Sequence, residues 1–309
     1  MKRLLRNIVV SVLCCIALQA CTPVSNNNGA GTSTAVSADD GAQVDMLDPS
    51  RGALLKFKDR VFSVPSPIQL ASVIQKAQLP YNKELLNSVN KYQTYTTSFK
   101  QALNLGIYGA NLGYINVFEQ LPDAAAYFGA IRALSNQLGI MNSFSEETMK
   151  RIERNNGNKD SLLYIASMMY RESDQYLLNA ERNEIGALII AGGWVEGLYL
   201  LTHIQQPKDI KPEIKELIGQ QKSALNNLIE LLRPHYGTIS NDYDTFLENL
   251  SELAAIFDDV NIKYTFNSTK TDEDKKITYV DCSTETVIDL QHVETITRKI
   301  EKLRNDITN

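Results

Sequence analysis

Glycine recurs at helical spacing in two apolar stretches of this chain, and that pattern restricts how the chain can fold. In the first stretch, Leu103–Phe118, glycine occupies positions 106, 109 and 113; in the second, Ile185–Ile204, it occupies 186, 192, 193 and 197. Each glycine costs a helix about 0.5–1 kcal/mol relative to alanine. Because only glycine lets helix backbones approach closely, we expect these two helices to pack together at the centre of the core.

The backbones are expected to meet along the glycine faces of the two helices, which include Gly113 and Gly197. A shift of 84 residues superposes Gly113 on Gly197, and the glycine four positions before each also coincides. A proline break and another helical pattern follow both stretches. An internal duplication of helical hairpins would explain the match, and so would the recurrent use of glycine in helix packing.

Most of the remaining chain shows the patterns of amphipathic helices. Apolar side chains recur with a period near 3.6 residues, and helices are predicted over residues 67–76, 92–118, 123–138, 162–177, 210–232, 243–257 and 283–304, with a short charged helix beginning at 145. Residues 54–64 are predicted as a short strand or an extended arm, and residues 262–266 and 277–280 as two strands. The predicted fold class is all-α, a mainly helical bundle with a small β-hairpin near the C-terminus.

The N-terminus has the features of a bacterial lipoprotein signal peptide. Three basic residues within the first six precede an apolar run over residues 8–18, which is too short to span a bilayer. Residues 18–21, with the sequence LQAC, then match a lipobox, because the small Ala20 suits the peptidase and Cys21 supplies the thiol that is acylated. The alternative is an ordinary secretory signal with a chance cysteine.

The chain is predicted to have three parts: residues 1–20 form the signal peptide, residues 21–50 the lipidated cysteine and a flexible tether, and residues 51–309 a single helical domain. The tether is rich in Asn, Gly, Ser and Thr, so it buries too little apolar surface to become ordered. Thr22 replaces the aspartate that holds many lipoproteins at the inner membrane, and no acidic cluster follows Cys21. We therefore predict a palmitate-type lipid anchor in the outer membrane, with the domain facing the periplasm.

The charge balance limits the kinds of partner that the protein can bind, and the cysteine count limits its disulfide bonds. The formal net charge is −5, and loss of the basic signal peptide makes the mature chain more acidic. An acidic chain without a basic run argues against nucleic acid as a partner and against electrostatic binding to a membrane. After cleavage and acylation, only Cys282 of the four cysteines would remain a free thiol, so no intramolecular disulfide is expected.

Glu196 is the most distinctive ionisable residue, because it lies inside the apolar stretch 185–204 with Tyr199 and His203 on the same helical stripe. One interpretation is a polar pocket, or a metal site with a second carboxylate, although metal binding needs three or four ligands. The other is a buried glutamate paired with an arginine or a tyrosine hydroxyl. In a membrane span this glutamate would cost about 2.5–3.5 kcal/mol, so the stretch is predicted as a buried helix of a soluble core.

Aromatic side chains lie beside the small residues of both glycine-rich stretches, at Tyr108, Tyr114, Trp194 and Tyr199. They would line a pocket, or they would belong to an ordinary core. The sequence contains no G-x-S-x-G elbow, H-E-x-x-H helix, phosphate-binding loop or C-x-x-C pair. We therefore predict no catalytic residue, no metal and no cofactor, and expect the chain not to be an enzyme.

Two segments resemble a pattern found in uncharacterised helical lipoproteins of Bacteroidetes, namely VPSP at residues 64–67 and YTTSFKQALNLGIYGANLGY at residues 95–114. The resemblance is most specific over these segments and covers the mature domain loosely. It implies an envelope location and an all-helical fold. It carries no catalytic residues, because no established activity comes with it.

These features predict a membrane-anchored envelope lipoprotein that is not an enzyme and that binds a protein partner or has a structural role in the periplasm. The alternative is a lipoprotein that binds a small apolar or amphipathic ligand in a pocket between its glycine-rich helices. A closed apolar cavity next to Trp194 would favour the ligand, whereas a solid core with an exposed apolar groove would favour the partner.

Overall fold

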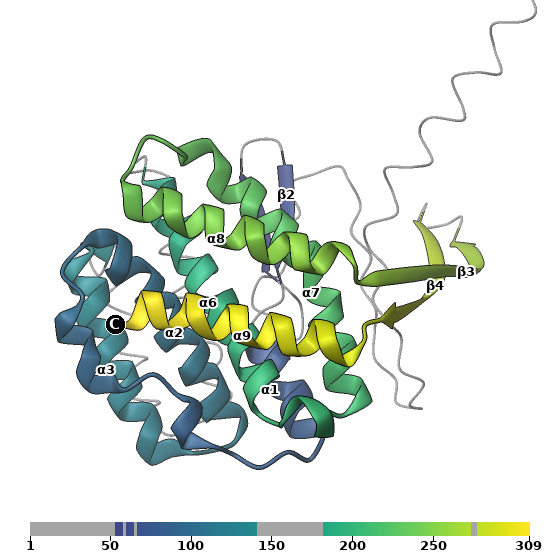
Figure 1. Cartoon of the computed structure of the whole chain (residues 1–309), viewed down its shortest axis with the longest axis horizontal. Helices are drawn as coiled ribbons and strands as arrows, with labels where there is room; N and C mark the ends of the chain where they lie inside the picture. The colour runs from purple at the N-terminus through teal and green to yellow at the C-terminus, as the bar shows by residue number, and fades with distance from the viewer. Residues whose placement is uncertain (1–52, 58–59, 65–66, 141–181, 273–276) are drawn as a thin grey trace, which may run out of the picture. The chain divides into compact units, whose positions relative to one another are not determined.

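The structure is a computed structural model that describes residues 53–57, 60–64, 67–140, 182–272 and 277–309 (Figure 1). The predicted signal peptide, Cys21, the tether and the helical patterns at 145–148 and 162–177 lie outside the described residues. Within the described ranges the chain forms α-helices, short 3-10 helices and two pairs of β-strands. The predicted fold class, mainly helical with a small hairpin near the C-terminus, is confirmed.

The elements that the structure describes are given in the order in which they follow one another along the chain. They are β1 (Ala53–Phe57), β2 (Arg60–Val64), α1 (Pro67–Lys76), η2 (Lys83–Leu85), η3 (Val89–Thr94), α2 (Ser98–Val117), α3 (Leu121–Gln137), α6 (Asn183–His203), η5 (Pro207–Asp209), α7 (Pro212–Leu232), η6 (Arg233–His235), α8 (Asn241–Asp258), β3 (Asn261–Asp272), β4 (Ile277–Val287) and α9 (Leu290–Thr308).

The two glycine-rich helices, α2 and α6, lie at the centre of the helical core, as their sequences predict. Most residues of both helices are buried: α6 is apolar around nearly its whole circumference, and α2 buries three asparagines among its apolar residues. They pack extensively against each other and against α1 and α9. In addition, α2 packs on the following helix α3, and α6 packs on the following helix α7.

The backbones of α2 and α6 come into direct contact at Gly106 and Gly192. A Cβ atom added to Gly106 would overlap the carbonyl oxygen of Ile189 and crowd the amide nitrogen of Gly193. A Cβ atom added to Gly192 would overlap the carbonyl oxygen of Leu103. No other residue type fits at these two positions without moving one helix away from the other.

One of the two glycines named for this contact, Gly197, does not lie at the backbone contact. At Gly197, an added Cβ would meet the side chain of Leu70 in α1, with 2.6 Å to its Cδ1 atom, rather than a helix backbone. Gly109 is exposed, and an added Cβ there would meet nothing within 4 Å. Crossing helices touch over only a few turns, so regular spacing does not reveal which glycine lies at the crossing. Because Gly109 is exposed and Gly193 is buried, their surroundings lend no support to the proposed duplication.

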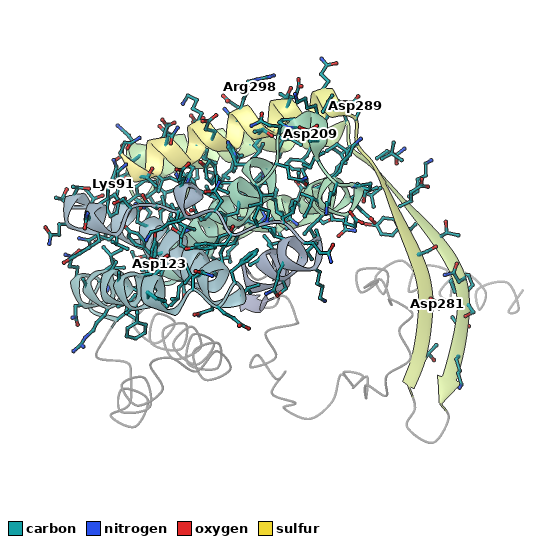
Figure 2. The ribbon with its side chains drawn as sticks, turned by 90° about the horizontal axis from the view of Figure 1, so that it is seen from below. Lys91, Asp123, Asp209, Asp281, Asp289 and Arg298 are labelled. Atoms are coloured by element: carbon teal, nitrogen blue, oxygen red, sulfur yellow. The ribbon has the colours of Figure 1, made fainter. Side chains whose placement is uncertain are left out.

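The amphipathic helices α7, α8 and α9 each bury one face in the core. The C-terminal helix α9, drawn in yellow in Figure 1, runs across α2 and α6 and contacts both. Its buried apolar positions are Val293, Ile296, Ile300, Leu303 and Ile307. Its opposite side is exposed to solvent, and Arg298 there points away from the other helices (Figure 2).

Two helices begin six or more residues later than predicted, and a side-chain cap accounts for each of these starts. Residues 92–94 belong to η3, and α2 begins after Thr97, whose hydroxyl accepts a hydrogen bond from the Lys100 amide at 3.2 Å. Residues 283–287 belong to β4, in agreement with the β-branched residues there. The last helix therefore starts at Leu290, where Asp289 accepts a hydrogen bond from the His292 amide at 2.8 Å.

The segment at residues 54–64 forms two strands rather than one strand or an extended arm. β1 and β2 pair antiparallel, with Ala53 opposite Val64 and Phe57 opposite Arg60. The sequence signal for two strands was the run of polar residues at positions 58 to 60, between two more apolar halves of the segment.

The contacts divide the described residues into two units. One comprises residues 262–287, which form most of the β3–β4 sheet, and the other comprises the helices together with β1 and β2. In the β3–β4 unit the hydroxyl oxygens of Thr271 and Thr278 lie 3.1 Å apart, and Asp281 is exposed (Figure 2). Both strands extend beyond the predicted segments 262–266 and 277–280.

Candidate functional site

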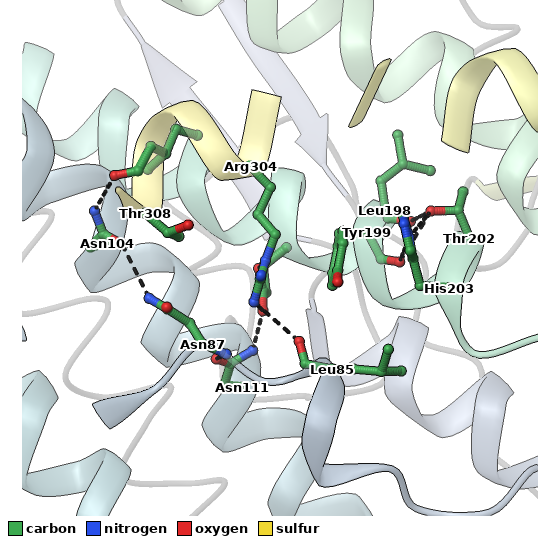
Figure 3. A network of polar contacts seen from close by, with 12 residues as sticks. Leu85, Asn87, Asn104, Asn111, Leu198, Tyr199, Thr202, His203, Arg304 and Thr308 are labelled. Atoms are coloured by element: carbon green, nitrogen blue, oxygen red, sulfur yellow. Dashed lines mark hydrogen bonds and ion pairs between the residues drawn. The ribbon is translucent and has the colours of Figure 1, made fainter. Parts of the chain in front are cut away.

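Three of the six residues predicted for a pocket lie together at one buried ion pair, and one of them belongs to the pair. Glu196, Tyr199 and His203 occupy the C-terminal half of α6. Glu196 contacts Arg304 of α9. Tyr199 also contacts Arg304, and His203 stacks on Tyr199 (Figure 3). This confirms the interpretation of Glu196 as a buried glutamate paired with an arginine.

The carboxylate of Glu196 is fully buried and receives three hydrogen bonds. The Nε atom of Arg304 donates to Oε2 at 2.7 Å, and Nη2 donates to Oε1 at 3.0 Å. Oε1 also accepts a hydrogen bond from the amide of Asn111 in α2 at 2.5 Å. The carboxylate therefore joins the three helices α2, α6 and α9 at one point.

Arg304 is held on each side of its guanidinium group. A further hydrogen bond runs from Nη2 to the carbonyl oxygen of Leu85 in η2, at 3.1 Å. The guanidinium carbon lies 4.1 Å from the centroid of the Tyr199 ring, a cation–π contact. Burial by itself lowers the pKa of Arg304, but attraction and hydrogen bonding to Glu196 outweigh burial, so the pKa is raised and the guanidinium stays charged.

His203 continues the stack at the end of α6. Its ring lies 4.0 Å from the Tyr199 ring, centroid to centroid, and its Nδ1 atom is 2.9 Å from the carbonyl oxygen of Tyr199. The Nε2 atom is 3.9 Å from a carboxylate oxygen of Glu301. Burial lowers the pKa of His203, so the imidazole is neutral at pH 7.

A chain of buried amides extends from the ion pair. The Oδ1 atom of Asn111 accepts from the backbone amide of Asn87 at 3.0 Å. The side-chain amide of Asn87 donates to the hydroxyl of Tyr95 at 3.1 Å and to Oδ1 of Asn104 at 3.4 Å. We call these residues together with the ion pair the Glu196 network: Asn87, Tyr95, Asn104, Asn111, Glu196 and Arg304.

The network also binds the end of α9, whose last carbonyl groups have no partner within the helix. Asn104 donates to the carbonyl oxygen of Ile307 at 3.1 Å, and the Tyr95 hydroxyl donates to that of Thr308 at 3.3 Å. The Nζ atom of Lys91 lies 3.3 Å from the same Thr308 oxygen. The network therefore fixes both the position and the end of the C-terminal helix.

The other three predicted pocket residues are fully buried, and their polar atoms bond to groups other than Glu196, although the ring of Tyr108 lies beside Tyr95 of the Glu196 network, with 6.5 Å between the centroids. The indole of Trp194 donates to Gln221 of α7 at 3.2 Å. The hydroxyl of Tyr108 donates to the carbonyl oxygen of Ser88 at 2.8 Å. The hydroxyl of Tyr114 accepts from the amide of Asn82 at 2.9 Å. Burial raises the pKa of Tyr108 and Tyr114, so both hydroxyls remain neutral. Each polar atom is thus used to tie a neighbouring segment to α2 or α6.

The chemistry of the Glu196 network favours a structural role. A general acid or base must reach the proton that it transfers, whereas Glu196 is 0% exposed and already receives three hydrogen bonds. Within the described residues, no group of three or more His, Cys, Asp or Glu side chains gathers where it could hold a metal ion. The hydrogen bonds to the Glu196 carboxylate join α2, α6 and α9.

Sequence reasoning missed the partners of Glu196, although the sequence holds signals for them. Arg304 falls on the apolar stripe of α9, between Leu303 and Ile307, where a charged residue needs a buried partner. Asn104 and Asn111 are seven apart in an apolar helix, so they share one face.

The helix α6 is long and apolar enough to cross a membrane, and it is the one such helix among the described residues. In its most hydrophobic window, 78% of the residues are buried inside the structure. That burial supports the prediction of a core helix.

Comparison with protein families, with curated proteins and with solved structures finds no match for this chain.

Proposed function

We propose that this protein is a lipid-anchored lipoprotein of the bacterial cell envelope. The observation that carries the proposal is the LQAC sequence at residues 18–21, preceded by a basic segment and a short apolar run. Acyl chains contribute about 0.8 kcal/mol per buried methylene, so several chains on Cys21 give durable anchoring. The tether that follows separates the helical domain from the lipid headgroups, with an r.m.s. reach of about 30 Å.

The proposed location is the periplasmic face of the outer membrane. Thr22 in place of an aspartate supports the outer membrane, and the lack of an acidic cluster after Cys21 supports the periplasmic face. The resemblance to helical lipoproteins of Bacteroidetes supports an envelope location in general.

The proposed role of the helical domain is to bind a protein partner or to act as a structural element, without catalysis. The full set of internal hydrogen bonds at Glu196 supports this role, because the most distinctive ionisable group of the sequence is used to hold helices together. Binding of a small apolar ligand between α2 and α6 is the weaker proposal. At Gly106 and Gly192 the two backbones touch, which leaves no room for a ligand at that crossing.

The anchoring proposal is tested by Cys21→Ser in the full chain, expressed in a bacterium that processes lipoproteins. We expect the variant to lose its acyl chains, detected by mass spectrometry, and to move from the membrane fraction to the soluble fraction. Cys282→Ser is the matched control and should remain acylated and membrane-bound. A Cys21→Ser protein that stays in the membrane after a carbonate wash would refute lipid anchoring as the mode of attachment.

The two proposed roles are separated by native mass spectrometry of the chain without residues 1–21, purified from its own host. A mass equal to that of the chain, or of a complex with a second protein, supports the partner-binding or structural role. An added mass of a few hundred daltons that is lost on denaturation would support the ligand-binding role instead.

A further inference from the structure

We draw no further inference here: the strongest candidate, the exposed apolar surface formed by Tyr264 and Phe266 on strand β3 of the β3–β4 hairpin, carries nothing, because nothing in the structure shows what covers it.

Discussion

Two contacts of α6, one helical turn apart, hold the core by different physical means. At Gly192 the backbone of α6 touches the backbone of α2 directly, and no side chain is involved. At Glu196 the same helix joins α2 and α9 through a buried charge and its hydrogen bonds. The first contact requires that residue 192 has no side chain, whereas the second requires that Glu196 keeps its partners Arg304 and Asn111.

This difference decides how each contact responds to change. Close packing of the two backbones stabilises the fold through dispersion. Atoms added at the contact lower the free energy of unfolding, by an amount that depends on how far the helices can separate. A buried ion pair offsets a large desolvation cost, so removal of one partner leaves an uncompensated charge in the core. The Glu196 network is therefore expected to be the more sensitive of the two contacts, although it adds little net stability relative to an apolar core.

The largest effect is expected for Glu196→Gln. The amide has nearly the shape of the carboxylate but no charge, so Arg304 would be left buried without a counter-charge. We expect a loss of about 3–5 kcal/mol in the free energy of unfolding. Urea denaturation of the chain without residues 1–21, followed by circular dichroism, measures this loss.

Two further variants sharpen that measurement. Glu301→Gln removes a carboxylate that is half exposed on α9, so it should cost less than about 1 kcal/mol. The double variant Glu196→Leu/Arg304→Met replaces both charges by apolar groups and should recover most of the loss of the single variant. If Glu196→Gln were no more destabilising than Glu301→Gln, the ion pair would not hold the core as described.

The next largest effect is expected for Gly106→Ala. The added methyl group would overlap the backbone of α6. A backbone cannot relieve the overlap by changing rotamer, as a side chain can. Overpacking costs about 1–3 kcal/mol or more, which exceeds the gain of roughly 1 kcal/mol in helix propensity. We expect a lower midpoint in the same denaturation experiment. A more stable variant would mean that α2 and α6 do not touch at this glycine.

Gly109→Ala should act in the opposite direction. Gly109 lies in the same helix, three residues further on, but it is exposed and has open space where the methyl group would go. The substitution should stabilise the chain by about 0.5–1 kcal/mol through helix propensity alone. The opposite signs expected for Gly106→Ala and Gly109→Ala make the pair independent of the exact magnitudes. A destabilised Gly109→Ala variant would show that this face of α2 is covered.

The comparison also shows how far the sequence could predict the structure. The helices α2 and α6 were predictable as the centre of the core, because glycine at helical spacing is a local pattern. The residue at the crossing was not, since Gly106 and Gly109 look alike until the partner helix is placed. Glu196 stood out in an apolar stretch, but its partner Arg304 lies 108 residues further along the chain. Tertiary packing determines which residue pairs with Glu196 over that distance, and the local spacing of residues in the sequence does not show it.

The smallest effect is expected from the pH dependence that His203 confers. Burial lowers the pKa of His203 in the folded chain, so the unfolded chain, in which the pKa is about 6.5, binds the proton more readily. The contribution of His203 to stability is therefore complete above the unfolded pKa and is lost as the pH falls through the folded pKa.

His203→Gln removes this difference in proton binding between the folded and the unfolded chain. Urea denaturation at pH 7.5, 6.5 and 5.5 should show a shallower loss of stability toward acid in the variant than in the parent chain. The ring stack on Tyr199 is lost at every pH, so the diagnostic quantity is the difference in slope and not the stability at one pH. Equal slopes would mean that the imidazole protonates as readily in the folded chain as in the unfolded one, and that the stack beside Arg304 does not shield it from solvent.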